Sequence, residues 1–225
     1  ASQSRARFLA AASHDLRQPL YALTLFSSAL RAGETDPAKL TRVLHIEECV
    51  ASLDHLFSEL LDLSRLETGT VHAAMADVRL DEVFDEVSRN FRMLAESRGL
   101  RLIVRKTDAW VRADRTMLTR ILNNLVSNAL RHSSRGLGAV RIEPVLANEV
   151  GRVELHVLDD GPGVAAAVRE QVFEPFFTTH NQGTGLGLFI SRELCQTNGA
   201  LLAYETRAGG GSVFRIIFAD PQRWE

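Results

Sequence analysis

Apolar side chains recur at alternating three- and four-residue steps through the first third of the chain. One stripe runs through Leu9, Ala12, Leu16, Pro19, Leu23, Phe26 and Leu30. After a break containing Gly and Pro at residues 31–37, a second stripe runs through Val43, Ile46, Val50, Leu53, Phe57 and Leu60. This is the spacing of a coiled-coil seam, so residues 1–68 are predicted to form a helical hairpin. Each stripe is too narrow to be stable alone. Pairing two hairpins into a four-helix bundle would hide both, and we therefore expect a homodimer.

The pattern changes near residue 70, where short strands begin to mix with amphipathic helices. Helices are predicted at residues 80–96, 115–132 and 185–197, the second of them capped by Asp114. Strands are predicted at residues 71–78, 100–105, 110–113, 140–146, 151–158, 200–206 and 212–218. Because β-hairpins alternate with helices, we expect residues 70–225 to form an α+β sandwich, a mixed β-sheet with helices on one face.

The composition, 45% hydrophobic and 24% charged, is that of an ordinary globular protein and excludes disordered, collagen-like and membrane classes. A net charge of -2 gives no drive toward nucleic acid or anionic lipid, so neither is an expected partner. With no apolar run of about 18 residues and no signal peptide, we expect a cytoplasmic chain without membrane contact. The missing initiator Met indicates a piece of a longer protein, which leaves room for a membrane anchor upstream. Cys49 and Cys195 lie in apolar helical runs and are expected to be reduced core residues.

His14 is the first candidate for chemistry. With Leu9 at heptad position a, His14 falls at position f and points away from the bundle core. A lone surface histidine usually has no function, but Pro19 should bend the helix one turn later by clashing with the carbonyl of Asp15. A neutral imidazole is a nitrogen nucleophile, and the neighbouring carboxylate can hold its other N–H and accept that proton. His14 and Asp15 are therefore a predicted nucleophile and base pair.

One face of the helix predicted at 115–132 is rich in amides. Asn124 and Asn128 stand four residues apart on this face, with Arg131 and His132 one turn further on. Such residues are either ordinary solvated positions or, alternatively, an amide ligand for a hard cation such as Mg²⁺ beside an arginine that meets phosphate.

Glycine-rich tracts follow this helix. Asp159 ends a predicted strand and opens the sequence DDGPG, in which Gly161 and Gly163 permit either an ordinary turn or the close approach of a flat ligand. A carboxylate there can accept the exocyclic amine of adenine. The tract GTGLGL opens a helix, where backbone N–H groups can approach phosphate. The only lysines, Lys39 and Lys106, lie outside glycine loops and no HRD or DFG occurs, which excludes Walker A and Ser/Thr/Tyr kinase sites.

Six motifs in one order make the chain resemble the transmitter region of sensor histidine kinases over essentially its whole length. ASHDLRQPL resembles the H box, NNLVSNALRH the N box, DDGPG the G1 box, FEPFF the F box, GTGLGL the G2 box and GGGSVF the last glycine box. The resemblance implies a dimerisation and histidine-phosphotransfer domain over residues 1–68. It implies an ATP-binding domain of the gyrase, Hsp90, kinase and MutL type over residues 70–225. ATP and Mg²⁺ would be the ligands, and a response-regulator receiver domain would take the phosphoryl group from His14.

The resemblance also implies roles for single residues. Asn128 would be the Mg²⁺ ligand, and Asp159 would bind adenine. The phosphates and ribose would be lined by Asn124, Arg131 and His132. The remaining pocket residues would come from the glycine boxes and from a lid over residues 164–184: Gly161, Gly163, Phe173, Thr184, Gly185, Leu186 and Gly187. Phe173 would support the lid together with Phe176 and Phe177.

Two positions near the acceptor depart from the common family pattern. Gln18 stands where Thr or Asn is usual, and Asp15 replaces the more common Glu. We expect kinase chemistry to survive both changes, with weak phosphatase activity through the Gln18 amide. Below the acceptor, the outward heptad positions carry Tyr21, Leu25 and Ser28, which are predicted to dock the regulator because aromatic anchors are favoured at interface centres.

Two other functions fit part of the pattern. A related ATPase of the gyrase or Hsp90 branch would drive conformational change by hydrolysis, but it would have no use for His14 and the bend at Pro19. A degenerate transmitter would act only as a dimeric docking scaffold, but it would have no need of Asn128, Asp159 and the glycine boxes.

Overall fold

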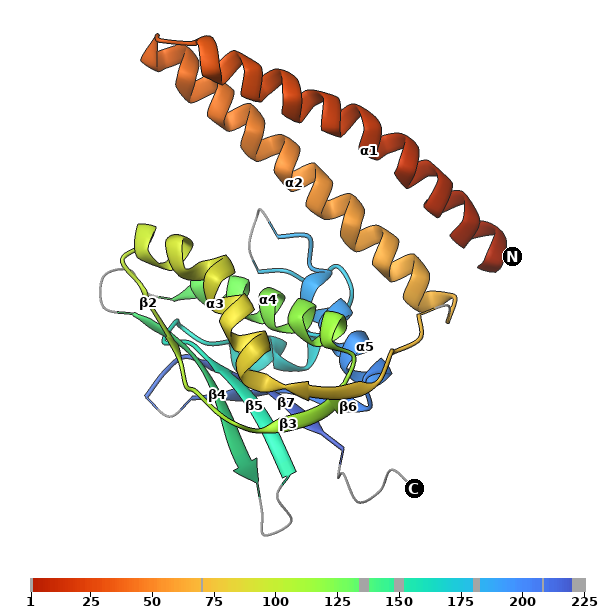
Figure 1. Ribbon diagram of the computed structural model, residues 1–225, viewed down its shortest axis with the longest axis vertical. Helices are drawn as coiled ribbons and strands as arrows, with labels where there is room; N and C mark the ends of the chain where they lie inside the picture. Colours follow the sequence, from red (N-terminus) through yellow and green to blue (C-terminus); the bar gives the residue numbers. More distant parts are fainter. Residues whose placement is uncertain are drawn as a thin grey trace. The chain divides into compact units, whose positions relative to one another are not determined.

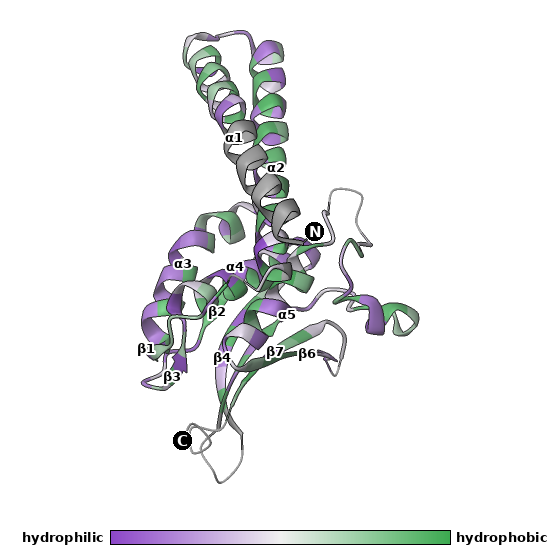
Figure 2. Cartoon of the chain, turned by 90° about the vertical axis from the view of Figure 1, so that its right-hand side faces the viewer, coloured by the Kyte–Doolittle hydropathy of each residue, from purple (hydrophilic) through white to green (hydrophobic). Residues whose placement is uncertain are grey.

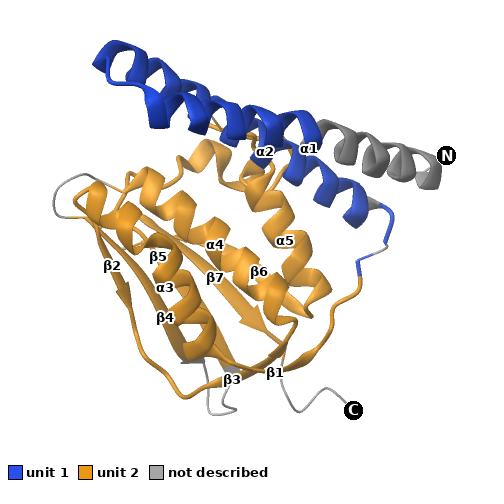
Figure 3. Cartoon of the chain, turned by 45° about the horizontal axis from the view of Figure 1, so that its top comes forward, with its two compact units in different colours: residues 1–71 blue, residues 72–225 orange. Residues whose placement is uncertain are grey.

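The chain folds into two compact units, Ala1–Val71 and His72–Glu225 (Figure 3). The computed structural model describes residues 2–69, 71–133, 138–147, 152–179, 183–207 and 209–219. For residues 2–17 it describes the backbone alone.

The first unit is the predicted helical hairpin. Helix α1 (Ser2–Gly33) continues through Pro19, and helix α2 (Pro37–Glu67) follows a short connection. Asp36 caps α2, because its carboxylate accepts a hydrogen bond from the backbone N–H of Ala38 at 2.8 Å. A capping Asp followed by Pro at the first helical position is a favourable start for a helix.

The apolar seam of the hairpin divides into two sets. Val43 and Val50 of the second stripe are buried, and on the first helix Leu20 is buried, which lies next to the stripe and not in it. Other seam residues stay exposed on both helices: Leu23, Phe26, Leu30, Ile46 and Leu53. Figure 2 shows hydrophobic stretches on both helices of the hairpin. The hairpin therefore carries more apolar surface than it buries within itself.

The second unit contains a mixed five-stranded sheet and a two-stranded ribbon (Figure 1). Its elements are β1 (Ala76–Arg79), α3 (Leu80–Ser97), β2 (Arg101–Val104), β3 (Trp110–Ala113), α4 (Arg115–His132), β4 (Ala139–Ala147), β5 (Arg152–Leu158), the 3₁₀ helix η1 (Ala166–Gln171), α5 (Gly187–Thr197), β6 (Ala200–Thr206) and β7 (Ser212–Phe218). The large sheet has the order β2-β4-β5-β7-β6, in which only β2 and β4 are parallel. β1 and β3 form the antiparallel ribbon.

Helices α3, α4 and α5 cover one face of the large sheet (Figure 1). The alternate strand residues that face them are almost fully buried: Val140, Ile142, Leu155, Val157, Phe214 and Ile216. The opposing helix positions include Leu118, Ile121, Leu122, Leu125 and Val126. This confirms the predicted mixed sheet with helices on one face. None of the described helices is long and apolar enough to cross a membrane.

Asp114 fixes the position of α4. One carboxylate oxygen accepts from the N–H of Met117 at 3.0 Å, which is the predicted helix cap. The other oxygen accepts from the N–H of Ala74 at 2.8 Å, and the Asp114 N–H donates to the amide oxygen of Asn198 at 2.6 Å. One residue thus joins the start of α4, the end of α5 and the segment that enters the second unit.

Three sequence predictions need correction. The strand predicted at 71–78 is reduced to Ala76–Arg79, because the N–H of Ala74 bonds to Asp114 instead of a neighbouring strand. The helix η1 was not predicted, because six residues are too short for a periodic signal. Cys195 is buried, which raises the pKa of its thiol to about 12, but Cys49 is exposed, and its assignment to the core was wrong.

Candidate functional site

Asp159 lies at the end of β5, where its side chain is almost completely removed from solvent, with 3% exposure. Its Oδ1 accepts hydrogen bonds from the backbone N–H groups of Gly161 at 2.9 Å and Ser212 at 3.3 Å. Burial raises the pKa of this carboxyl above its ordinary value, and hydrogen bonds from the N–H of Gly161 and from the hydroxyl and N–H of Ser212 partly offset that effect. A carboxylate has about four acceptor sites, so Asp159 can accept a further bond from a ligand.

The backbone around Asp159 is packed so closely that only glycine fits at several positions. A Cβ on Gly161 would lie 2.5 Å from the carbonyl oxygen of His132, and one on Gly211 would overlap the carbonyl oxygen of Asp159. Gly163 has a φ of 71°, and a Cβ there would lie 3.0 Å from the carbonyl oxygen of Gly211. Three segments therefore meet through their backbones: the DDGPG loop, the end of α4 and the turn before β7.

Helix α4 carries the amide residues into this region. The Nδ2 of Asn124 donates to Ser191 Oγ of α5 at 2.7 Å, and a Cβ on Gly187 would lie 2.7 Å from Asn124 Oδ1. Asn124 thus packs against the start of α5, while His132 lies against the DDGPG loop. Half-buried Asn128 is one helical turn from each, so it lies between these two contacts. Arg131 is exposed near the end of the same helix.

The segment between the DDGPG loop and α5 is held at its start and near its middle. At its start, the N–H of Val164 donates to the hydroxyl of Tyr204 at 2.9 Å. Further along, the ring of Phe173 meets the edge of Phe214 with centroids 6.5 Å apart. Phe176 has a φ of 64°, a conformation that is uncommon for a bulky residue, and is 62% exposed.

The GTGLGL tract forms the start of α5. Gly185 has a φ of 70°, and a Cβ there would overlap the backbone of Phe176. Leu186 is buried, and its N–H donates to Thr184 Oγ1 at 3.3 Å. The sequence pattern did not predict Tyr204, Ser191 and Ser212, because their roles depend on contacts with distant parts of the chain.

The structure places the phospho-acceptor candidates on α1. His14 and Asp15 lie in this helix, and their side chains are outside the described part. Gln18, one turn later, is exposed. Tyr21 and Leu25 are 66% and 53% exposed, and the seam residue Phe26 is 68% exposed. Ser28 differs, since it is half-buried and its hydroxyl donates to Glu47 Oε1 of α2 at 3.3 Å.

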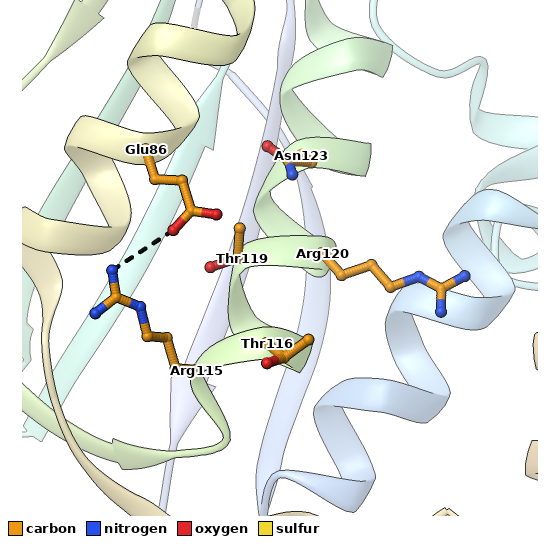
Figure 4. Close-up of a pocket in the computed structure, with 6 residues that line it drawn as sticks. All are labelled: Glu86, Arg115, Thr116, Thr119, Arg120 and Asn123. Carbon is orange, nitrogen blue, oxygen red and sulfur yellow. Dashed lines mark ion pairs between the residues drawn. The ribbon is translucent and has the colours of Figure 1, made fainter.

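A separate hollow of about 300 Å³ opens between α3 and α4 (Figure 4). It is lined by Glu86, Arg115, Thr116, Thr119, Arg120 and Asn123. Figure 4 shows the ion pair between Arg115 and Glu86, and Arg115 also pairs with Glu82 at 2.6 Å. Its lining includes none of the predicted nucleotide-site residues, so the hollow is distinct from the region around Asp159.

Both units match known families. The family model described as His Kinase A (phospho-acceptor) domain matches residues 4–69. The one described as Histidine kinase-, DNA gyrase B-, and HSP90-like ATPase matches residues 113–222. A phospho-acceptor hairpin followed by this ATPase fold defines the class of histidine kinase cores.

Individual relatives agree with this class. The Sensor protein kinase PilS of Pseudomonas aeruginosa is 35% identical over 96% of this chain, which spans 41% of that protein. The catalytic domain of histidine kinase ThkA is 30% identical, with a TM-score of 0.58 over 65% of this chain and 95% of that one. Full-length ShkA, in complex with AMPPNP, is 26% identical, with a TM-score of 0.74 over 95% of this chain and 46% of that one. The chain belongs to the histidine kinase family, as its six motifs predicted, and it spans less than half the length of PilS.

Replacing Asp159 with Asn should separate folding from nucleotide binding. Because the pKa of Asp159 is raised on folding, its ionised form destabilises the folded state above the ordinary carboxyl pKa, and this cost is lost as the pH falls through the raised pKa. At pH 7, Asp159→Asn should therefore unfold at an equal or higher temperature than the wild type in scanning calorimetry. If Asp159 binds adenine, as the motif resemblance implies, the affinity for ADP in titration calorimetry should fall at least roughly tenfold, because an amide group is a poorer acceptor for the adenine amine.

The neighbouring carboxylate supplies the matched control. Asp160 Oδ2 accepts from the N–H of Ala139 at 2.9 Å, and an Asn side chain can keep this bond. Asp160→Asn should bind ADP within about twofold of the wild type. Wild-type affinity in Asp159→Asn would remove Asp159 from the nucleotide site.

Proposed function

We propose that this chain is the catalytic core of a two-component sensor kinase that binds ATP in its second unit and transfers the γ-phosphoryl group to His14. The observation that carries the proposal is Asp159, a buried carboxylate at the end of a strand, held by two backbone N–H groups and flanked by closely packed glycines. That arrangement suits a flat base with an exocyclic amine. The ShkA structure, solved with AMPPNP, supports a nucleotide as ligand.

Adenine would bind at Asp159, with Gly161 and Gly163 allowing its close approach. The phosphates would extend toward the end of α4 and the start of α5, where the contacts would come from Asn124, Arg131, His132, Thr184, Gly185 and Gly187. Backbone N–H groups at the start of α5 and the guanidinium of Arg131 both favour negative charge. Phe173 and Leu186 would support the lid and the helix from beneath.

Mg²⁺ would be held by the side-chain oxygen of Asn128 together with the phosphates of ATP. Among the described residues, no group of three or more His, Cys, Asp or Glu could hold a metal by itself. This fits Mg²⁺, which is commonly bound by one or two protein oxygens plus substrate phosphates. When bound, the ion would neutralise charge that develops on the transferred group.

Transfer requires His14 to reach the γ-phosphate when the two units come together. An imidazole nitrogen would form the new bond to phosphorus while the bond to the β–γ bridging oxygen breaks and ADP leaves. Asp15 would accept the proton of the other imidazole nitrogen, and this stabilises the ring as it becomes positive. The phosphohistidine would then pass its phosphoryl group to an aspartate of a receiver domain.

Incubation with γ-labelled ATP and Mg²⁺ tests this step directly. The wild type should become labelled, and the label should be lost in acid but retained in base, because phosphoramidates are acid-labile. His14→Gln should abolish labelling and leave ADP affinity unchanged. His45→Gln, an exposed histidine of the same hairpin, should label normally. An acid-stable label, or full labelling of His14→Gln, would contradict the assignment.

We extend the proposal to weak phosphatase activity through Gln18. Gln18 is exposed one helical turn after His14, and its amide can orient a water molecule toward a phosphorylated aspartate. Gln18→Ala should slow dephosphorylation of the regulator at least roughly threefold, while autophosphorylation stays within about twofold. Equal dephosphorylation rates with the wild type and with Gln18→Ala would show that the Gln18 amide takes no part in the reaction.

The exposed apolar residues of the hairpin would form two protein interfaces, one with a second copy of the chain and one with the receiver domain. Leu23, Phe26 and Ile46 belong to the seam and would pair with a second copy in a four-helix bundle. Tyr21 and Leu25 lie outside the seam and would dock the receiver domain below the acceptor. Ser28 would take part only at the margin, because its hydroxyl is bonded to Glu47.

Removing the two docking side chains should affect transfer but not assembly. Tyr21→Ala combined with Leu25→Ala should slow phosphotransfer at low regulator concentration at least roughly tenfold, about 1.4 kcal/mol. Light scattering should still give twice the 24.9 kDa chain mass, as for the wild type. The control is Met93→Ala with Leu201→Ala, which removes two exposed apolar groups from the other unit and should change neither measurement. Normal transfer, or loss of the dimer, would refute this docking surface.

A further inference from the structure

Tyr204 lies at the point where the nucleotide lid leaves the rigid part of the second unit. Its hydroxyl accepts the N–H of Val164 at 2.9 Å, and Val164 is the first residue after the DDGPG loop. The two residues are 40 positions apart in the sequence, so this bond ties the lid to the distant strand β6. From this contact and the rigidity of the ring described next, we infer that Tyr204 is a positioning residue that sets the direction of the lid. The inference rests on the proposed nucleotide site.

The ring of Tyr204 is well suited to this role because it is itself held in place. Tyr204 stands directly opposite Phe214 in the β6–β7 register, and the two rings pack at 5.3 Å between centroids. Phe173, from the far part of the lid, meets the edge of the same Phe214 ring. The guanidinium of Arg192 of α5 lies 6.0 Å from the Phe173 centroid. One aromatic group therefore holds the lid at its start and near its middle.

The hydrogen bond to Tyr204 also lies directly after a glycine, where the backbone has the most conformational freedom. Gly163, just before Val164, has a positive φ and can take many conformations. A Cβ there would lie 3.7 Å from the Tyr204 hydroxyl, which shows how closely the phenol approaches this turn. The carbonyl of Val164 in turn accepts from Arg169 Nε at 3.1 Å. Both backbone groups of Val164 are thus fixed immediately after a glycine in the left-handed region.

A positioning role for Tyr204 predicts a specific change in the kinetic constants. If the phenol holds the lid over bound nucleotide, its loss should weaken ATP binding and leave the transfer step from bound ATP intact. The change should therefore fall on KM and not on kcat. A role confined to packing would instead be satisfied by a phenyl ring, because the contact with Phe214 needs no hydroxyl.

Tyr204→Phe isolates the hydroxyl, and Ser97→Ala serves as its control. Ser97 donates to the carbonyl of Leu94 at 2.9 Å at the exposed end of α3, so its replacement also removes one hydroxyl hydrogen bond from the same unit. In titrations of the full 225-residue chain with AMPPNP and Mg²⁺, Tyr204→Phe should bind roughly three- to tenfold more weakly, the loss of one net hydrogen bond. The KM for ATP should rise by the same factor, kcat should stay within about twofold, and Ser97→Ala should match the wild type.

Hydrogen exchange gives a second measurement that does not depend on the kinase reaction. In Tyr204→Phe, exchange should become faster in a peptide covering residues 162–171 and stay unchanged in peptides from β6 and β7. Wild-type nucleotide affinity in Tyr204→Phe would overturn the inference. Faster exchange throughout β6 and β7 would overturn it too, since the residue would then be a general packing element. Failure of the wild type to bind AMPPNP would instead overturn the proposed function.

Discussion

Contact between backbones that leaves no room for a Cβ is the constraint on which the rest of the second unit depends. At Gly161 and Gly211, the chain passes so close to the carbonyls of His132 and Asp159 that any side chain would force the segments apart. The end of α4, the end of β5 and the turn before β7 must therefore be placed with high precision. The mixed sheet supplies two of these positions through the β5–β7 pairing, and the cap at Asp114 supplies the third by fixing where α4 begins.

This precision has a cost in stability that the core offsets. Burial raises the pKa of Asp159, because the ionised carboxylate is better solvated in the unfolded chain than in the folded state. Phe176 holds an unfavourable backbone conformation nearby. On the sheet face beneath α4, fully buried side chains such as Ile142 and Leu155 each contribute on the order of 2 kcal/mol by leaving water. Unfavourable features are thus concentrated at the candidate site, while the favourable ones lie in the layer that positions it.

The elements that could be predicted from the sequence were those governed by local rules. Periodicity located α1, α2 and α4, and Asp114 was recognised as a cap because the cap is formed within one turn of the chain. Ser28 is a position where local rules fail, because the heptad count from Leu9 predicted an outward side chain. An ideal helix drifts by about 20° per heptad from a 3.5-residue repeat, so the error in the predicted direction grows with distance from Leu9. Cys49 was misassigned because a two-helix hairpin buries little of each helix. Tyr204 could not be found at all, since its hydroxyl acts on a residue 40 positions away.

Motion in the second unit is expected mainly in the segments that have the fewest buried side chains. The helix η1 has no buried residue, in contrast to α4, which is buried along its length. Segments with few buried apolar contacts open at the lowest free energy, and lids over binding sites belong to this group. Because Val164 and Phe173 are both held by the aromatic residues of β6 and β7, an opening that admits nucleotide has to bend the segment between these anchors or the segment after Phe173. Phe176, which is exposed and has an unfavourable positive φ, lies in that second segment. Opening that relaxes this backbone conformation would be favoured by the strain energy released, so contacts with the nucleotide would have to supply that energy when the segment closes.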